Sequence, residues 1–90
     1  MKIEKVTITP IKPFKGLIAF AHLFIEGGLY LGSIGVYTKR DGSGYRLTYP
    51  TRKVGDVNIS IFHPTTQKCS KEFEKMILEE VSRIFETLTT

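Results

Sequence analysis

The stretch "GLIAFAHLFIEGGLYLGSIGVY", residues 16–37, decides the fold, because one polar turn divides two apolar runs. Glu26, Gly27 and Gly28 form that turn, and Gly-Gly between runs rich in aromatic and aliphatic residues is typical of a β-hairpin. The stretch has nearly the roughly 20 residues that cross a bilayer, but a central Glu and two glycines are unfavourable in lipid. We therefore predict strands over residues 17–26 and 29–38, and no membrane span.

The flanking segments indicate further strands. Residues 2–9 alternate, with Val6 and Ile8 on one side, and Pro10 and Pro13 are expected to end this strand. After the hairpin, an Asp-Gly-Ser-Gly turn at residues 41–44 leads into a short strand that Pro50 ends. Residues 57–62 alternate cleanly and predict a half-buried strand.

The period changes near residue 67, where a helix is expected to begin with Thr66 or Ser70 as its N-cap. Apolar residues then recur at helical spacing and form one stripe: Phe73, Met76, Ile77, Val81, Ile84, Phe85 and Leu88. The order of elements predicts an α+β fold, with an antiparallel β-sheet of four to five strands followed by one C-terminal α-helix. We expect residues 1–90 to form a single domain.

The second strand is apolar on both of its faces. One face holds Leu17, Ala19, Ala21, Leu23 and Ile25, and the other holds Ile18, Phe20 and Phe24. A solvated face would be polar instead, and one helix covers only one face of a sheet. We therefore predict that a second copy of the chain covers the other face in a homodimer.

Charge and cysteine content limit the partners and the compartment. Residues 1–67 hold nine Lys and Arg against four Asp and Glu, whereas residues 68–90 hold four against five. This asymmetry directs any polyanion towards the strands and their loops. Cys69 is the only cysteine, so no internal disulfide forms, and the first residues lack a signal sequence. A cytoplasmic location is expected.

The sequence gives little support to catalysis or metal binding. Ser33 lies in Leu-Gly-Ser-Ile-Gly, which misses the spacing of a nucleophile elbow, and is interpreted as a small strand residue. His22, His63 and Cys69 lack the pair spacing of a zinc site, so no metal site is expected. His22 is interpreted as a core or interface residue, and His63 as a strand terminator near the helix start. We expect no enzymatic activity, no cofactor and no small-molecule substrate.

A basic and aromatic set remains, and it can be interpreted in two ways. Guanidinium and ammonium groups contact phosphates, and tyrosine rings stack on unpaired bases, which together suit a nucleic-acid surface. Lys and Arg at hairpin tips and edge strands also serve solubility alone. The residues concerned are Lys39, Arg40, Arg46, Arg52 and Lys53, interleaved with Tyr37, Tyr45 and Tyr49.

A family resemblance bears on this choice. A hairpin, then "GYRLTYPTRK" at residues 44–53, a Gly-containing turn, "SIFHP" at residues 60–64 and a helix together resemble the stage V sporulation protein G (SpoVG) family. The likeness runs from about Val6 to Phe85, and residues 33–37 fall on the family's Asp-Ile-Arg-Val-Ile strand. The matching anchors are Gly44, Pro50, Arg52, Lys53, His63 and Pro64.

The resemblance implies a homodimeric DNA- and RNA-binding regulator, linked to sporulation, asymmetric septation and gene regulation, without enzymatic activity. The chain departs from the family in three places. Ser33 and Gly35 replace an Asp and an Arg, the hairpin over residues 38–44 is longer and adds Lys39 and Arg40, and Ser70 stands where the family tends to carry Arg. Sequence preference is therefore not carried over.

Two functions are carried forward from the sequence. The first is nucleic-acid binding through Arg52, Lys53, Lys39, Arg40 and Arg46, with Lys68 and Lys71 as flanking phosphate contacts. The second is a protein-interaction module of the division or sporulation machinery that meets an acidic partner and no nucleic acid.

Overall fold

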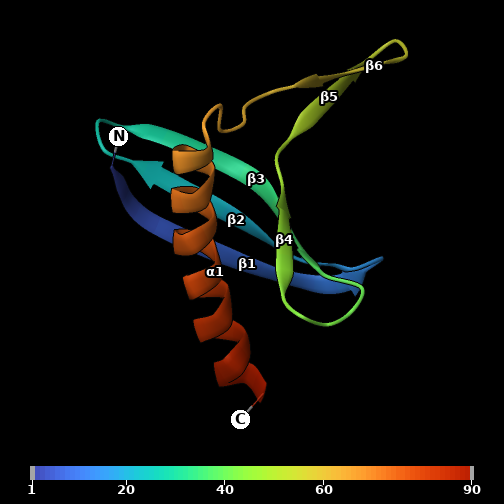
Figure 1. The fold of residues 1–90 in the computed structure, drawn as a ribbon, viewed down its shortest axis with the longest axis vertical. Helices are drawn as coiled ribbons and strands as arrows, with labels where there is room; N and C mark the ends of the chain where they lie inside the picture. Colours follow the sequence, from blue (N-terminus) through green and yellow to red (C-terminus); the bar gives the residue numbers. More distant parts are fainter. Residues whose placement is uncertain (1, 90) are drawn as a thin grey trace.

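The computed structural model describes the backbone of residues 2–89 and the side chains of residues 2–85. Within this range the strands precede one long helix, which confirms the predicted α+β class (Figure 1). The elements are β1 Ile3–Phe14, β2 Leu17–Ile25, β3 Leu29–Thr38, β4 Tyr45–Thr48, β5 Thr51–Val54, β6 Val57–Ser60 and α1 Gln67–Thr89.

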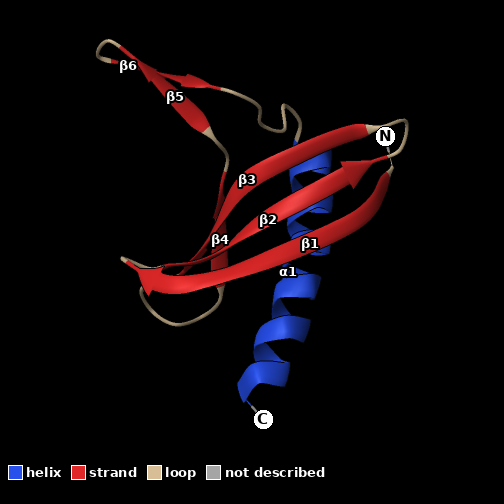
Figure 2. Cartoon of the chain, turned by 180° about the vertical axis from the view of Figure 1, so that it is seen from behind, coloured by secondary structure: helices blue, strands red, loops and turns tan. Residues whose placement is uncertain are grey.

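The first four strands form one antiparallel sheet in the order β1-β2-β3-β4. α1 lies across one face, which we call the inner face, whereas no described element covers the opposite, outer face (Figure 2). The inner face supplies the core, because its large aliphatic side chains are buried, and full burial of each one stabilises the fold by about 1.5–3 kcal/mol. Its fully buried members on sheet and helix include Leu23, Ile34, Val36, Ile77 and Val81.

The predicted β2–β3 hairpin is confirmed, and it contains a bulge. Ala21 pairs with Ile34, but Leu23 pairs with Leu31, so β3 carries one extra residue between the two pairs. Ser33 takes up this residue with φ 62°. Because a shift of one residue turns every following side chain to the other face, the bulge keeps both Leu31 and Ile34 on the inner face.

The first strand is longer than its prolines predict. β1 runs to Phe14, through both Pro10 and Pro13, so the expectation that these residues end it is wrong. Proline lacks an amide donor but is tolerated where a strand has one free edge. β1 is such an edge strand, because it pairs only with β2 within the described sheet.

The helix follows the predicted stripe. Phe73, Ile77 and Val81 are buried against the sheet, and Met76, Ile84 and Phe85 pack beside them. Thr66 is the N-cap, since its Oγ1 accepts a hydrogen bond from the Cys69 amide at 3.1 Å, whereas Ser70 lies inside the helix. The side chain of Leu88, the last predicted member of the stripe, lies outside the described residues.

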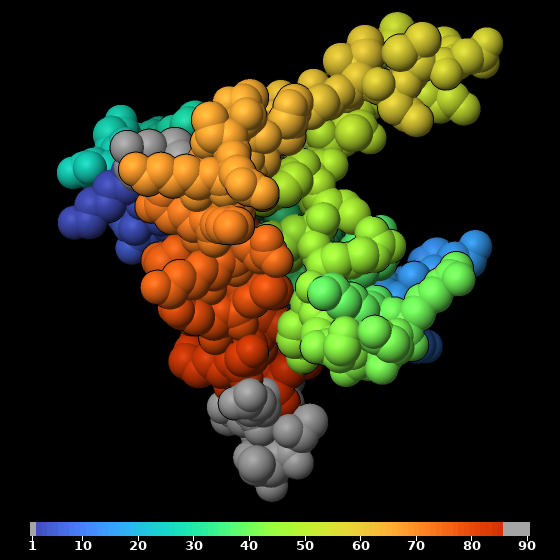
Figure 3. All heavy atoms as spheres, viewed as in Figure 1, coloured from blue at the N-terminus to red at the C-terminus, as the bar shows by residue number. Residues whose placement is uncertain are grey.

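Strands β5 and β6 form a separate two-stranded hairpin, which we call the arm (residues 51–60). It projects from the body and has no extensive contact with the other described elements (Figures 1 and 3). Every residue of both strands is exposed, so the prediction of a half-buried strand over residues 57–62 is wrong. The alternation is present, but no part of the described chain covers the apolar side.

Within the described residues, no helix has the long apolar run that crossing a membrane requires. The stretch with the composition of a span, residues 16–37, is the β2–β3 hairpin instead.

Candidate nucleic-acid interface

A basic hollow lies at the end of the sheet where β4 begins. We use this name for the concavity lined by Lys15, Gly16, Tyr37, Thr38, Lys39, Arg40 and Arg46. Three segments far apart in sequence form it: the β1–β2 turn, the end of β3 with its loop, and the start of β4. Of the predicted cations, Lys39, Arg40 and Arg46 are brought together here, and Lys15 joins them.

Backbone hydrogen bonds tie the walls of the basic hollow together. The Thr38 amide donates to the Gly16 carbonyl at 2.9 Å, which fastens the β1–β2 turn to β3. The Lys39 amide donates to the Gly44 carbonyl, also at 2.9 Å, and closes the β3–β4 loop. Lys15 and Gly16 occupy the turn with φ 50° and 88°. Backbone hydrogen bonds therefore hold the turns that carry Lys15, Lys39 and Arg40, and Arg46 lies on β4.

Arg46 and Tyr37 are in contact at the edge of the basic hollow. They are paired in the β3–β4 ladder, and the Arg46 guanidinium carbon lies 4.6 Å from the centre of the Tyr37 ring. This is a cation–π geometry, in which the ring holds the guanidinium plane without using its N–H donors. Those donors stay available to a phosphate or a base edge.

The one carboxylate in the β3–β4 loop, that of Asp41, is hydrogen-bonded within the loop itself. Asp41 Oδ1 accepts the Ser43 amide at 2.9 Å, as expected for Asp in such a turn. Hydrogen bonds from Ser43, together with the nearby Lys39, lower the pKa of Asp41. Asp41 is absent from the residues that line the basic hollow. The lining is therefore cationic, and an anion would meet no carboxylate there.

The Arg52-Lys53 pair is split by the arm. Adjacent residues of a strand point to opposite faces. Arg52 pairs with Ile59 and shares its face with Val54, whereas Lys53 pairs with Asn58. All of these side chains are exposed. Lys53 therefore has a polar, solvated setting for a phosphate, while Arg52 lies among aliphatic side chains.

Lys68 and Lys71 lie at the start of α1 and are exposed. They are three residues apart, so they share one side of the helix. The basic hollow lies near the start of β4 and the arm follows its end, whereas the helix start lies across the body (Figure 1). The predicted cations therefore form three separate groups on the single chain.

The predicted tyrosines lie in different surroundings. Tyr37 faces the basic hollow, but Tyr45 and Tyr49 pack against the core. Burial, with smaller effects from Cys69 and Glu74, raises the pKa of Tyr49 to about 12. Tyr49 also meets Phe62 edge to face, with ring centres 6.1 Å apart. Tyr49 and Phe62 therefore pack on each other where the arm joins the body.

Sequence reasoning placed Phe20 and Phe24 on the outer face but missed that His22 and Tyr30 join them in one aromatic group. Phe20, His22 and Phe24 alternate along β2, and Tyr30 lies beside them on β3. The His22 and Tyr30 rings are stacked with centres 5.9 Å apart, and the Tyr30 hydroxyl lies 2.8 Å from His22 Nδ1. The signal was the type of residue at alternating positions from Ala19 onward: the outer positions are aromatic, whereas the inner ones are aliphatic. The predicted faces of Leu17 and Ile18 are wrong, because a bulge between Leu17 and Ala19 leaves Leu17 on the outer face and packs Ile18 against the core.

The remaining candidates for a catalytic or metal-binding site lie apart from one another. His22 lies on the outer face, with its Nε2 3.4 Å from Thr9 Oγ1. His63 Nδ1 lies 2.7 Å from Ser60 Oγ, so this ring contacts the end of the arm. Within the described residues, no three His, Cys, Asp or Glu side chains gather in one place.

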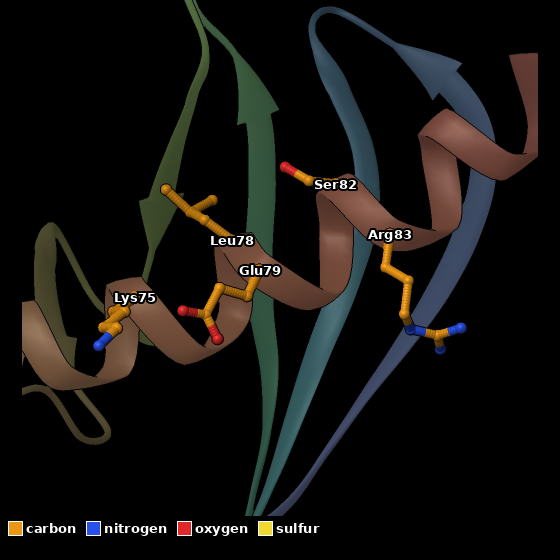
Figure 4. Close-up of a pocket in the computed structure, with 5 residues that line it drawn as sticks. All are labelled: Lys75, Leu78, Glu79, Ser82 and Arg83. Carbon is orange, nitrogen blue, oxygen red and sulfur yellow. The ribbon is translucent and has the colours of Figure 1, made fainter.

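A second depression lies on the solvent side of α1 (Figure 4). All the residues that line it come from this one helix, and Arg83 is paired with Glu80 one turn back. Charges of both signs on a single helix face are typical of a solvated surface. The depression is therefore not a candidate site. The lining residues are Lys75, Leu78, Glu79, Ser82 and Arg83.

Comparisons with models of known protein families, with curated proteins and with solved structures give no match to this chain.

Proposed function

We propose that the protein is a homodimeric nucleic-acid-binding regulator of the SpoVG type, and that the basic hollow is its phosphate-binding site. The observation that carries this proposal is the gathering of Lys15, Lys39, Arg40 and Arg46 around one concavity with no acidic residue in its lining. Multiple cations at one place supply the electrostatic part of nucleic-acid affinity. The link to sporulation, septation and gene regulation rests on the family resemblance alone.

Salt-dependent binding tests the phosphate site. Fluorescence anisotropy with mixed-sequence duplex DNA and single-stranded RNA is expected to show binding that weakens steeply with salt. On duplex DNA, the double variant Lys39→Ala, Arg40→Ala is expected to reduce the slope of log K against log salt by about 0.9 for each phosphate that it no longer neutralises. Lys75→Ala, an exposed cation on α1, is the matched control. Equal slopes for both variants would contradict the site.

The arm supports the homodimer. An isolated two-stranded hairpin is at best marginally stable in water. This one exposes Val54, Val57, Ile59 and Ile61 to between 50% and 62% of their surface. A second copy of a chain this small is an economical cover for that side, and a C2 arrangement covers both arms at once. Arg52 then lies at the dimer contact, and Lys53 on the opposite face remains a phosphate contact.

Two substitutions on one strand test this arrangement. Ile59→Asp places a charge on the apolar side of the arm and is expected to give monomers in sedimentation at micromolar concentration. Asn58→Asp introduces the same charge on the opposite side and is expected to leave the dimer intact. Monomers for the unmodified chain, or dimers for Ile59→Asp, would remove the arm from the interface.

The second candidate is a protein-interaction module without nucleic-acid binding. The exposed aliphatic side of the arm favours it, because such a surface also fits a different protein. Absence of binding to DNA and RNA at low salt, with the arm still required for a complex with an acidic partner, would select this alternative.

A further inference from the structure

The outer face of the sheet carries a regular arrangement of rings. Strand register divides it into rows that run across the strands. One row holds Phe14, Leu17, Tyr37 and Arg46, the next Thr9, Phe20, Gly35 and Thr48, the next Thr7 and His22, and the last Lys5, Phe24 and Tyr30. Each row contains at least one aromatic side chain, counting the imidazole of His22. A continuous ring-bearing surface therefore runs along β2 and its neighbours.

Phe24 and Tyr30 are exposed, whereas Phe20 and His22 are half-buried. Phe24 is 39% exposed and Tyr30 is 54% exposed, and their ring centres are 5.1 Å apart with planes tilted by 55°. Gly35 is buried in the middle of the surface, because the side chains of Thr48 and Tyr37 cover it, and a Cβ there would come within 2.6 Å of Thr48 Oγ1. Flat ligands therefore have the most direct access to Phe24 and Tyr30.

Cations lie at both ends of this face. Lys5 Nζ lies 5.8 Å from the Phe24 ring centre in the last row, and Arg46 lies against Tyr37 in the first. Among the paired outer-face positions there is no Asp or Glu, and Glu4 lies exposed in the β1 bulge beside Lys5. Rings with cations at both ends complement a ligand that is flat, apolar on its faces and anionic along its backbone.

The spacing of the rings selects unpaired bases. Alternate residues of a strand lie about 6.7 Å apart, which separates Phe20, His22 and Phe24 along β2. Neighbouring nucleotides in one strand of B-DNA are about 3.4 Å apart along the axis, half of that spacing. Each base must therefore leave its stack to meet a ring, which a single strand permits and a duplex does not.

The surface continues into the basic hollow. Tyr37 and Arg46 belong to the first row of the outer face and also line the basic hollow. A strand whose phosphates lie in the basic hollow can therefore extend over the rings without crossing a polar gap. The guanidinium of Arg46 itself offers a plane on which a base can stack.

We propose that the outer face binds the unpaired bases of a single-stranded nucleic acid by stacking on Phe20, Phe24 and Tyr30, with Lys5 and Arg46 near its phosphates. This inference rests on the proposed function, because it names the form of nucleic acid that the protein prefers. It also requires that the second copy cover the arm and not the outer face, which is the surface that the sequence predicts as the dimer contact.

Substitutions that keep the apolar surface and remove the ring test the stacking. Phe24→Leu and Tyr30→Leu are compared by anisotropy on a labelled mixed-sequence RNA strand and on the same sequence as a duplex. Each substitution is expected to weaken single-strand binding by about fivefold to a hundredfold, as base–aromatic contacts do, while duplex binding stays within about twofold. Leu29→Ala, the exposed neighbour of Tyr30 in sequence, is the control and should bind both forms normally.

Tyrosine fluorescence supplies a second readout, since the chain has four Tyr and no Trp. The single strand should quench the emission of the unmodified chain, and Tyr30→Leu should lose part of that quenching.

Equal affinity of both Leu variants and the unmodified chain for the single strand would overturn the inference while leaving the basic hollow intact. Conversion of dimers to monomers by Phe24→Leu would also overturn it, because a second copy would then occupy the face. Absence of binding to any nucleic acid would instead refute the proposed function.

Discussion

The β2–β3 hairpin and the β5–β6 hairpin have a similar sequence pattern but differ in burial. β2 and β3 join through Gly27 and Gly28, lie in the middle of the sheet and place Leu23 and Ile34 in the same buried cluster as the apolar side of α1. β5 and β6 join through Gly55, pair only with each other within the described chain and leave their aliphatic side chains exposed. Alternation and turn chemistry specify a hairpin in both cases, but only contact with a second layer makes its apolar side a core.

The largest expected difference between the hairpins concerns matched isoleucines. Ile34→Ala removes a fully buried side chain and is expected to lower the free energy of unfolding by about 2–5 kcal/mol. Ile59→Ala, on the exposed arm, is expected to change it by less than about 0.5 kcal/mol. Urea denaturation at protein concentrations below dimer formation measures both. Similar decreases would show that the arm packs against its own body.

A glycine in each hairpin sharpens the contrast. Gly35→Ala places a methyl group 2.6 Å from Thr48 Oγ1, so β4 must move, and a destabilisation of about 1–3 kcal/mol is expected. Thr48→Ala in the same chain should restore part of this stability. Gly55 has open space but φ 62°, so Gly55→Ala should cost about 1 kcal/mol through its backbone alone. No described side chain would meet a Cβ at Gly55, so no second substitution should restore the stability of Gly55→Ala. If Thr48→Ala does not restore stability to Gly35→Ala, the packing at Gly35 is contradicted.

Alkaline pH tests the junction between the body and the arm. Burial raises the pKa of Tyr49 from its ordinary value of 10.0 to about 12. The neutral phenol is the form that the fold favours, so its contribution to stability is complete below pH 10 and is lost as pH rises towards 12. Chemical denaturation across this range should show falling stability, and Tyr49→Phe should remove that part of the fall. An unchanged pH profile in Tyr49→Phe would assign the effect to other groups.

The smallest expected effect concerns the bulge at Ser33. A residue other than glycine with φ 62° is strained, so Ser33→Gly is expected to raise stability by about 0.5–1 kcal/mol. Ser60→Gly, in the extended backbone of the arm, should give no gain. Thermal unfolding followed by circular dichroism compares the two variants, and a decrease of stability in Ser33→Gly would count against the strain.

The sequence was sufficient for the fold class, the β2–β3 hairpin and the helix, because each depends on local periodicity. It was insufficient for β1, since the tolerance of Pro10 and Pro13 depends on which strand lies at the edge of the sheet. The same limit applies to residues 57–62, whose alternation is independent of whether anything covers them. Burial is a property of the neighbours, and periodicity alone does not identify them.

The candidate site was anticipated only in part. The loop cations Lys39 and Arg40 with Arg46 meet as one group because β3 and β4 are paired. Lys15 was missed, since only the β1–β2 turn brings it beside Thr38. Arg52 and Lys53 are adjacent in sequence but lie on opposite faces of the arm, because they belong to a strand. Adjacency in sequence and adjacency in space thus gave different groupings of the same charges.

The order β1-β2-β3-β4 has a consequence for how the chain is made. Each strand of the sheet pairs with its immediate predecessor, so pairing can advance strand by strand as the polypeptide leaves the ribosome. The helix that covers the inner face is translated after every strand. A nascent chain therefore passes through a stage in which the sheet has begun to form while Ala21, Leu23 and Ile34 remain uncovered. Slowing translation before residue 67 would prolong that stage and favour association between nascent chains.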